Sequence, residues 1–216
     1  MSENNTIAAM RKVYKLKSLE EKDVNADPII QFDTWWKEAV ANKLEEPNAM
    51  TLATCNASGR PSARIVLLKG IHHNGFVFYT NYNSRKAREI EENPFVALVF
   101  FWEGLERQVR IEGAIKKVSQ QESDEYFSVR PRESQLGAWT SPQSSIIDNQ
   151  AFLLKNLKIY SHKFQGEEVP RPEHWGGFIV EPSTIEFWQG RPGRLHDRLQ
   201  YSLSENKEWV IRRLAP

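Results

Sequence analysis

Ala63-Arg-Ile-Val-Leu-Leu-Lys-Gly-Ile-His-His-Asn-Gly-Phe-Val-Phe-Tyr-Thr80 is the stretch of sequence that decides the fold. Its two apolar runs, Ala63 to Leu68 and Phe76 to Thr80, have the length and composition of short strands. Asn74-Gly75 lies between the runs and suits a tight hairpin turn, because both central positions of that turn require positive φ. The stretch therefore predicts short strands joined by tight turns.

Outward from this hairpin the same pattern recurs, interrupted by helices. Further strands are expected at Met50–Cys55, Phe95–Trp102, Arg107–Val118, Gly177–Glu181, Ile185–Trp188 and Trp209–Arg212. Helices are expected from Asp27-Pro28 toward Leu44, at 84–93, at 119–129, where Ser119 and Glu122 form a capping box, and at 149–165. Many short strands with a few inserted helices predict a mainly β protein with helices (α+β), built on a small β-barrel.

Composition restricts the classes of protein that the chain can represent. Its 216 residues carry 29 Lys+Arg against 28 Asp+Glu, a net charge of +1, so a nucleic-acid-binding surface is not expected. Cys55 is the only cysteine, which excludes an internal disulfide and a cysteine-based metal site. No signal peptide is visible, and the longest apolar run, 95–102, is far shorter than the about 20 residues that span a bilayer. We expect a cytoplasmic protein with a mobile N-terminal arm over residues 1–25 and a single domain over residues 26–216.

Positive side chains gather in the segment Glu186-Phe-Trp-Gln-Gly-Arg-Pro-Gly-Arg-Leu-His-Asp-Arg198. If residues 194–198 are extended, Arg194, His196 and Arg198 share one face of the strand. Such a row favours an anionic ligand. A solvated edge strand, in which Asp197 and Glu186 offset the arginines, is about equally compatible with this segment alone.

Three other groups of residues point to phosphate. Ser84 is a candidate N-cap of a helix whose first turn holds Arg85 and Lys86. The helix dipole prefers anions at this end, so the two positive charges are unfavourable there unless a phosphate binds beside them. Arg64 and Lys69 flank a strand and would point to opposite faces if that strand is regular. The third group recurs at steps of four residues and consists of Tyr126, Arg130 and Ser134. The alternatives are cations that extend into water and, for Tyr126, a half-buried helix aromatic.

The motifs of the common nucleotide and metal enzymes are missing. The chain contains no G-x-x-x-x-G-K-[ST], no G-x-G-x-x-G and no H-E-x-x-H, and its five histidines lack metal-ligand spacing. Any redox chemistry therefore requires an organic cofactor. One of the seven tryptophans, Trp188, lies beside the basic segment and could contact a flat ring.

The chain resembles the pyridoxine (pyridoxamine) 5′-phosphate oxidase family along almost its whole length. The motifs that carry the resemblance occur in the family's order: Arg64-Ile-Val-Leu-Leu-Lys69, Phe78-Tyr-Thr-Asn81, Ser84-Arg-Lys86, Glu106-Arg-Gln-Val109, Ser128-Val-Arg-Pro-Arg-Glu-Ser-Gln135, Gln143-Ser-Ser145, Trp175-Gly-Gly177, Glu186-Phe-Trp-Gln-Gly190, Arg194-Leu-His-Asp-Arg198 and Arg213-Leu-Ala-Pro216. The resemblance implies an FMN-binding split β-barrel that acts as a homodimer. Local departures, such as the turn Arg191-Pro-Gly193, affect only loop geometry.

The resemblance also implies roles for individual residues. The FMN-binding set would be Arg64, Ile65, Val66, Leu67, Leu68, Lys69, Tyr79, Thr80, Arg85, Lys86, Gln108, Gln143, Ser144, Trp188 and Arg198. The substrate-binding set would be Lys69, Tyr126, Arg130 and Ser134 around the phosphate, Arg194, Leu195 and His196 near the pyridine ring, and Arg11 and Tyr14 in a covering N-terminal segment. Arg194 and His196 would be the catalytic residues, and no metal is implied.

The implied activity is the oxidation of pyridoxine or pyridoxamine 5′-phosphate to pyridoxal 5′-phosphate. FMN would accept the electrons and pass them to O₂, giving H₂O₂, with ammonia released from the amine substrate. The alternatives are a flavin or deazaflavin-dependent reductase on the same fold and a non-catalytic carrier of flavin or pyridoxal phosphate. A nucleic-acid-binding module is the weakest alternative because acids interrupt the basic residues.

Overall fold

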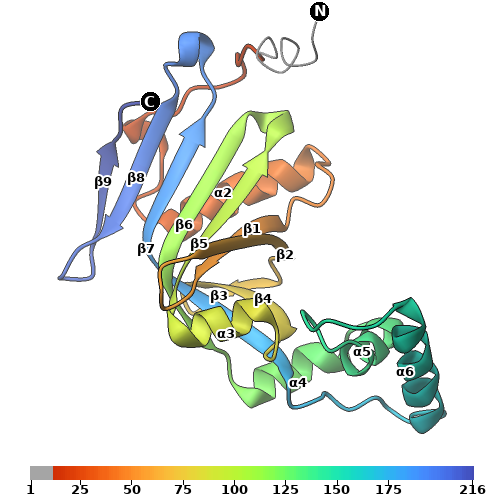
Figure 1. The fold of residues 1–216 in the computed structure, drawn as a ribbon. Coiled ribbons are helices and arrows are strands. Elements are labelled where there is room, and N and C mark those ends of the chain that lie inside the picture. The colour runs from red at the N-terminus through yellow and green to blue at the C-terminus, as the bar shows by residue number, and fades with distance from the viewer. Residues whose placement is uncertain (1–11) are drawn as a thin grey trace, which may run out of the picture. The chain divides into compact units, whose positions relative to one another are not determined.

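The computed structural model describes residues 12–216, and these residues form an α+β fold dominated by one antiparallel sheet (Figure 1). The strands are β1 (Ala49–Cys55), β2 (Pro61–Leu67), β3 (Gly70–His72), β4 (Gly75–Asn81), β5 (Phe95–Trp102), β6 (Arg107–Lys117), β7 (Trp175–Gln189), β8 (Asp197–Leu203) and β9 (Trp209–Arg213). The helices are α2 (Pro28–Ala41), α3 (Arg85–Glu92), α4 (Gln120–Ser128), α5 (Arg132–Thr140) and α6 (Gln150–Lys163). The mainly β expectation is thus confirmed.

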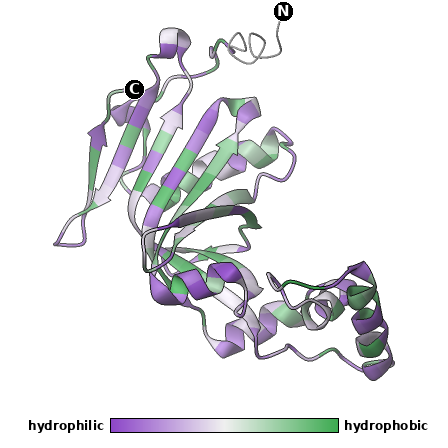
Figure 2. Ribbon diagram, in the orientation of Figure 1, coloured by the Kyte–Doolittle hydropathy of each residue, from purple (hydrophilic) through white to green (hydrophobic). Residues whose placement is uncertain are grey.

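The strand order is β2-β1-β5-β6-β7-β4-β3, with β8 added to β7 and β9 added to β8. The sequence predicted two strands at 177–181 and 185–188, but they are parts of the single long strand β7. Burial alternates along β1 and over most of β6, as expected for strands with one face in the core. Figure 2 shows the corresponding bands of apolar and polar residues along β6.

The helix starts follow the capping chemistry expected from the sequence. Asp27 accepts a hydrogen bond from the Ile29 amide at 2.7 Å, and Ser84 accepts one from Ala87 at 3.4 Å. Ser119 accepts one from the Glu122 amide at 3.1 Å. Each bond satisfies an amide that has no partner within its own helix.

Three expectations need correction. The hairpin turn is made by His73 and Asn74, with φ of 50° and 58°, so it lies one residue earlier than predicted and Gly75 begins β4. Strands β3 and β8 and helix α5 were not predicted from the sequence. Arg194 has φ of 63° at the end of a short 3₁₀ turn, so residues 194–198 are not extended throughout, and the shared face of Arg194, His196 and Arg198 is wrong.

The contacts divide the described residues into two compact units. The first comprises the chain up to Pro47, Val99–Ile111 and Ser183–Pro216. The second comprises Asn48–Leu98 and Glu112–Pro182. The predicted boundary at residue 25 stays a prediction. Within the first unit Leu19 is buried, and the amides of Lys15 and Leu16 donate to the Glu106 carboxylate at 2.8 and 3.1 Å.

Aromatic side chains form much of the core of the first unit. Phe32 of α2 meets Phe100 edge to face with ring centroids 5.1 Å apart, and Trp35 meets Phe187 in the same way at 5.1 Å. Arg107 is buried with its guanidinium carbon 4.2 Å from the Trp35 ring centroid, and it pairs with Glu38 at 3.0 Å. In the second unit a separate apolar cluster joins the helices to the start of β7 through Phe127, Leu136, Phe164, Val169 and Trp175.

Candidate functional site

Lys86 is the centre of the first candidate phosphate site, at the start of helix α3 in the second unit. Its ammonium donates to Thr80 Oγ1 at 3.1 Å, to Ser84 Oγ at 3.3 Å and to Gln143 Oε1 at 2.7 Å. All three acceptors are neutral. Burial, aided by repulsion from Arg64, lowers the pKa of Lys86 from 10.5 to about 8. A bound phosphate would supply the negative charge that these acceptors lack.

Glu89, one turn further along α3, holds the two arginines of the same site. Its carboxylate pairs with Arg64 at 3.2 Å and with Arg85 at 2.8 Å, and it also accepts from Thr54 and Ser62 at 2.5 Å each. Burial opposes ionisation, but the hydrogen bonds from Ser62, Thr54, Arg85 and Arg64 outweigh it and hold the pKa of Glu89 at about 2. The cluster therefore holds three cations, Arg64, Arg85 and Lys86, and one ionised carboxylate, which leaves it with net positive charge.

Arg130 is the centre of the second candidate phosphate site, in the link between α4 and α5. Its guanidinium carbon lies 4.3 Å from the Trp175 ring centroid, and burial lowers its pKa. Among the described residues, Arg130 Nη1 is buried and has no hydrogen-bond partner. A buried guanidinium nitrogen without a partner is costly unless an anion completes it. The site therefore fits a phosphate oxygen.

Stacked aromatic rings surround this second site. Tyr79 and Tyr126 stack with centroids 3.9 Å apart, and Tyr79 stacks on Trp175 at 5.5 Å. Burial raises the pKa of both tyrosines, so their hydroxyls stay protonated and can donate to an anion. Ser134 lies in the first turn of α5, while Lys69 follows β2 as an exposed residue.

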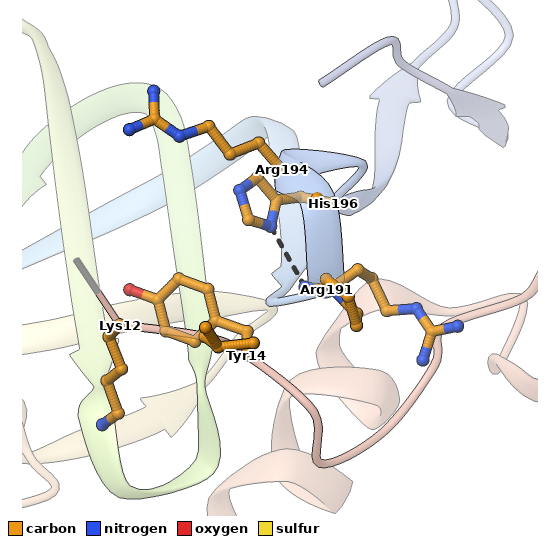
Figure 3. A pocket seen from close by; sticks show the side chains of 8 residues that line it. Lys12, Tyr14, Arg191, Arg194 and His196 are labelled. Atoms are coloured by element: carbon orange, nitrogen blue, oxygen red, sulfur yellow. Dashed lines mark hydrogen bonds between the residues drawn. The ribbon is translucent and has the colours of Figure 1, made fainter.

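A third group of candidate residues lines a cavity of about 330 Å³ in the first unit (Figure 3). Its lining includes Tyr14, Arg191, Arg194 and His196. The Tyr14 ring meets the rings of Trp188 and His196 edge to face, with centroids 5.6 and 5.7 Å apart. Burial, together with repulsion from Arg194, lowers the pKa of His196 below 6.5. This cavity offers aromatic walls, a guanidinium and an imidazole to a small planar ligand.

Arg198 and Arg194 have different surroundings, although the sequence predicted one face. Arg198 pairs with Glu186 at 2.8 and 3.1 Å and donates to the Ala215 carbonyl at 2.8 Å. For Arg198 the structure therefore agrees with the alternative from the sequence, in which a nearby carboxylate, here Glu186, offsets the arginine. Arg194 is exposed and lines the cavity.

The remaining candidates differ in exposure. Leu68 is buried and Val66, Leu67 and Gln108 are half-buried, whereas Ile65, Gln143, Ser144 and Leu195 are exposed. Arg11 lies outside the described residues.

Sequence reasoning did not assign Glu89, Trp175 or Arg191 to these sites, and it named Asp197 only as a carboxylate that offsets the arginines. The spacing of four between Arg85 and Glu89 is the one signal that would have identified a partner. No group of three His, Cys, Asp or Glu side chains in residues 12–216 is arranged to hold a metal ion. None of the described helices has the length and apolar character needed to cross a membrane.

Comparison with known proteins places the fold in the class of FMN-binding split β-barrels. An FMN-binding protein from Nostoc punctiforme related to pyridoxamine 5′-phosphate oxidase superposes with a TM-score of 0.67 at 18% identity, covering 84% of this chain and 97% of its own. PhzG from Burkholderia lata, solved with tetrahydrophenazine-1-carboxylic acid, superposes with a TM-score of 0.88 at 28% identity, covering 95% of this chain and 100% of its own.

Sequence comparison defines the family. Residues 36–162 match the family described as pyridoxamine 5′-phosphate oxidase, and residues 175–216 match the pyridoxine 5′-phosphate oxidase C-terminal dimerisation region. Pyridoxine/pyridoxamine 5′-phosphate oxidases from Nostoc sp. and Burkholderia thailandensis are each 56% identical to it over 98% of this chain and 99% of their own length. The chain belongs to the pyridoxamine 5′-phosphate oxidase family.

Proposed function

We propose that this protein oxidises pyridoxine or pyridoxamine 5′-phosphate to pyridoxal 5′-phosphate with FMN as its cofactor and O₂ as electron acceptor. The observation that carries the proposal is the half-buried Arg130, whose Nη1 is itself buried and has no hydrogen-bond partner among the described residues. A phosphorylated substrate supplies an anion of the right charge for it. The family of the chain and the names of its relatives support the same activity.

We assign the FMN phosphate to the cluster around Lys86. Lys86, Arg64 and Arg85 supply positive charge there, and Thr80 and Ser84 supply hydroxyl groups. The remaining cofactor residues assigned from the resemblance keep that assignment: Ile65, Val66, Leu67, Leu68, Lys69, Tyr79, Gln108, Gln143, Ser144, Trp188 and Arg198. The chemistry that bound FMN would supply is hydride acceptance from the substrate, followed by electron transfer to O₂, which yields H₂O₂.

The protein's own contribution to the reaction is positioning and charge. Arg130, Tyr126, Ser134 and Lys69 anchor the substrate phosphate, so binding energy from a non-reacting group fixes the reacting carbon. Arg194 and His196 orient the ring substituents, and the exposed Leu195 lies between them. Arg11 and Tyr14 cover the ring in this proposal.

A related oxidation of a different ring system is the second candidate. The structure of PhzG was solved with tetrahydrophenazine-1-carboxylic acid, which carries a carboxylate instead of a phosphate. The relatives at 56% identity favour the phosphorylated pyridine.

Purification followed by an absorbance scan and a peroxide assay tests the proposal. We expect yellow protein that binds FMN and releases one H₂O₂ for each pyridoxal 5′-phosphate formed. Protein that stays colourless after incubation with FMN contradicts the cofactor. Yellow protein that forms peroxide only from a dihydrophenazine or tetrahydrophenazine carboxylate contradicts the substrate.

We also propose that the enzyme is a cytoplasmic homodimer. The match of residues 175–216 to the dimerisation region supports self-association. Sedimentation of the FMN-loaded protein should give twice the chain mass of 25.1 kDa.

A further inference from the structure

His196 accepts a hydrogen bond at one ring nitrogen from the main chain of its own loop. The Arg191 amide lies 3.1 Å from His196 Nδ1, and Figure 3 shows this bond as a dashed line with the second ring nitrogen pointing away from Arg191. A main-chain N–H can only donate, so Nδ1 must carry a lone pair. The neutral ring therefore carries its proton on Nε2.

A carboxylate holds the loop in the conformation that makes this bond. Asp197 Oδ2 lies 3.3 Å from Arg191 Nε, and the same oxygen accepts from the Leu19 amide at 3.1 Å. Asp197 Oδ1 accepts from Arg213 at 2.9 Å. The Arg191 side chain also donates to the Lys17 carbonyl at 3.2 Å. Both ends of the segment 191–197 are thus tied to fixed partners.

The turn between these ends has a restricted backbone. Gly193 and Arg194 have φ of 66° and 63°, and this left-handed pair reverses the chain so that His196 returns to the Arg191 amide. Left-handed φ is unfavourable for arginine, so the turn needs outside support. The Asp197 ion pairs provide that support.

We propose that Arg191 and Asp197 are positioning residues that fix His196 as a hydrogen-bond donor through Nε2, so that His196 presents an N–H to an acceptor oxygen or nitrogen of the substrate and does not serve as its base. This inference rests on the proposed function for the identity of the substrate. Neither residue belongs to the FMN-binding or substrate-binding sets that the resemblance implies.

The charges around the imidazole agree with this assignment. Arg194, Arg191 and Lys12 line the same cavity as His196, as does the neutral Tyr14, and Asp197 is the neighbouring carboxylate. Burial and Arg194 lower the pKa of His196, while Asp197 raises it. Protonation at Nδ1 would also break the bond from Arg191, so the neutral donor form is favoured at neutral pH.

NMR of the FMN-loaded protein labelled with ¹⁵N-histidine tests the tautomer directly. We expect His196, assigned by comparison with His196→Asn, to show an unprotonated Nδ1 and a protonated Nε2 at pH about 7. A ring protonated at Nδ1, or at both nitrogens, would overturn the inference. This measurement needs no turnover, so it separates failure of the inference from failure of the proposed function.

Asp197→Asn tests the positioning role. Loss of the carboxylate should release Arg191, mix the two tautomers and lower kcat/KM about tenfold, the equivalent of one hydrogen bond. It should also shift the His196 titration to lower pH, because Asp197 raises that pKa. Asp197→Glu should partly restore kcat/KM and the His196 titration. If Asp197→Asn changes only the thermal stability, the positioning role is contradicted.

Two further variants complete the test. Arg191→Gln keeps the main-chain donor but removes the ion pair with Asp197, so it should reproduce the tautomer mixing even if Asp197→Asn fails to fold. Asp124→Asn is the matched control, because it removes a carboxylate from the Arg171 pair, which spans 2.6 Å, without contacting His196. An unchanged tautomer in Arg191→Gln would refute the positioning role.

Discussion

At the scale of single residues, buried cations that lack a full set of anionic partners distinguish the candidate sites from the ordinary surface. Arg107 is also buried, but Glu38 pairs with it and Gln189 accepts from it at 2.9 Å. Lys86 has only neutral acceptors, and Arg130 has a nitrogen with no partner among the described residues. Desolvated charges of this kind are unfavourable in the free protein and become favourable when an anion binds.

The depressed pKa of Lys86 predicts how FMN binding depends on pH. A phosphate dianion favours the charged ammonium, so binding raises the pKa of Lys86 above its value of about 8 in the free protein. FMN affinity should be level below about pH 8 and should fall by up to about tenfold per pH unit above it. Quenching of flavin fluorescence between about pH 7 and about pH 9 measures the effect.

Lys86→Arg is the control for that experiment, because arginine keeps its charge over this range. If the fall in affinity above about pH 8 persists in Lys86→Arg, another group is responsible.

Glu89 gives a prediction about stability. Its pKa is lowered from 4.5 to about 2, so the stabilisation from the ionised carboxylate is complete above about pH 4.5 and is lost as the pH falls toward 2. Glu89→Gln should lower the free energy of unfolding at neutral pH by about 2 kcal/mol and weaken its dependence on acid. Urea unfolding at several pH values measures both quantities. Glu91→Gln, an exposed position of the same helix, should change neither.

At the scale of elements, the sequence predicted most strands and helices because their apolar runs and N-caps are local signals. Asp27, Ser84 and Ser119 cap helices as expected. The hairpin turn differed by one residue, since the packing of Gly75 decides the register as much as turn preference does. Helix α5 follows Pro131 and has mixed polarity, so neither a capping side chain nor a clear apolar period marked it.

The shifted hairpin predicts a steric role for Gly75. A Cβ at this position would lie 2.5 Å from Ile179 Cγ1 and 2.9 Å from the Val180 carbonyl oxygen, so the β4–β7 pairing would have to move. Gly75→Ala should destabilise the protein by about 1–3 kcal/mol. Thermal unfolding followed by circular dichroism measures the loss.

Gly137→Ala is the matched substitution, in the interior of helix α5, where no atom outside the chain neighbours and the helix's own backbone lies within 4 Å of the added Cβ. It should be neutral or should stabilise by up to about 1 kcal/mol. Equal effects of the two substitutions would show that the contact with Ile179 does not decide the register.

At the scale of the whole molecule, the sequence predicted a set of site residues from the resemblance to the family but not how those residues are held. Motif matching placed Arg64, Lys86 and Arg130 among the ligands from their identity and order alone. Trp175 is distant in sequence from Arg130 and Glu89 is distant from Arg64, so the spacing of four between Arg85 and Glu89 is the local pattern that points to a partner. The condition that residues 194–198 are extended is not met for a related reason, because Asp197 next to the turn accepts hydrogen bonds from the distant Leu19 and Arg213.

Arg130 and Arg194 are assigned to different parts of the substrate, which predicts a difference between their variants. Arg130→Ala, in the second unit, should raise KM for pyridoxamine 5′-phosphate more than it lowers kcat, because it removes a phosphate contact. Arg194→Ala, in the first unit, should lower kcat/KM by at least about a hundredfold while FMN stays bound, because it removes a group assigned to the reacting ring.

Pyridoxamine without its phosphate separates the two roles. Against this truncated substrate Arg130→Ala should lose little more than the unaltered enzyme loses, since the group it contacts is already gone, whereas Arg194→Ala should still be impaired by a similar factor. The measurement is steady-state peroxide release by the unaltered enzyme, Arg130→Ala and Arg194→Ala, each with pyridoxamine 5′-phosphate and with pyridoxamine. If Arg130→Ala loses its flavin, or if both variants respond alike to removal of the phosphate, then the assignment of the substrate phosphate to Arg130 is wrong, and Lys86 and Arg130 must be reassigned between the two phosphates.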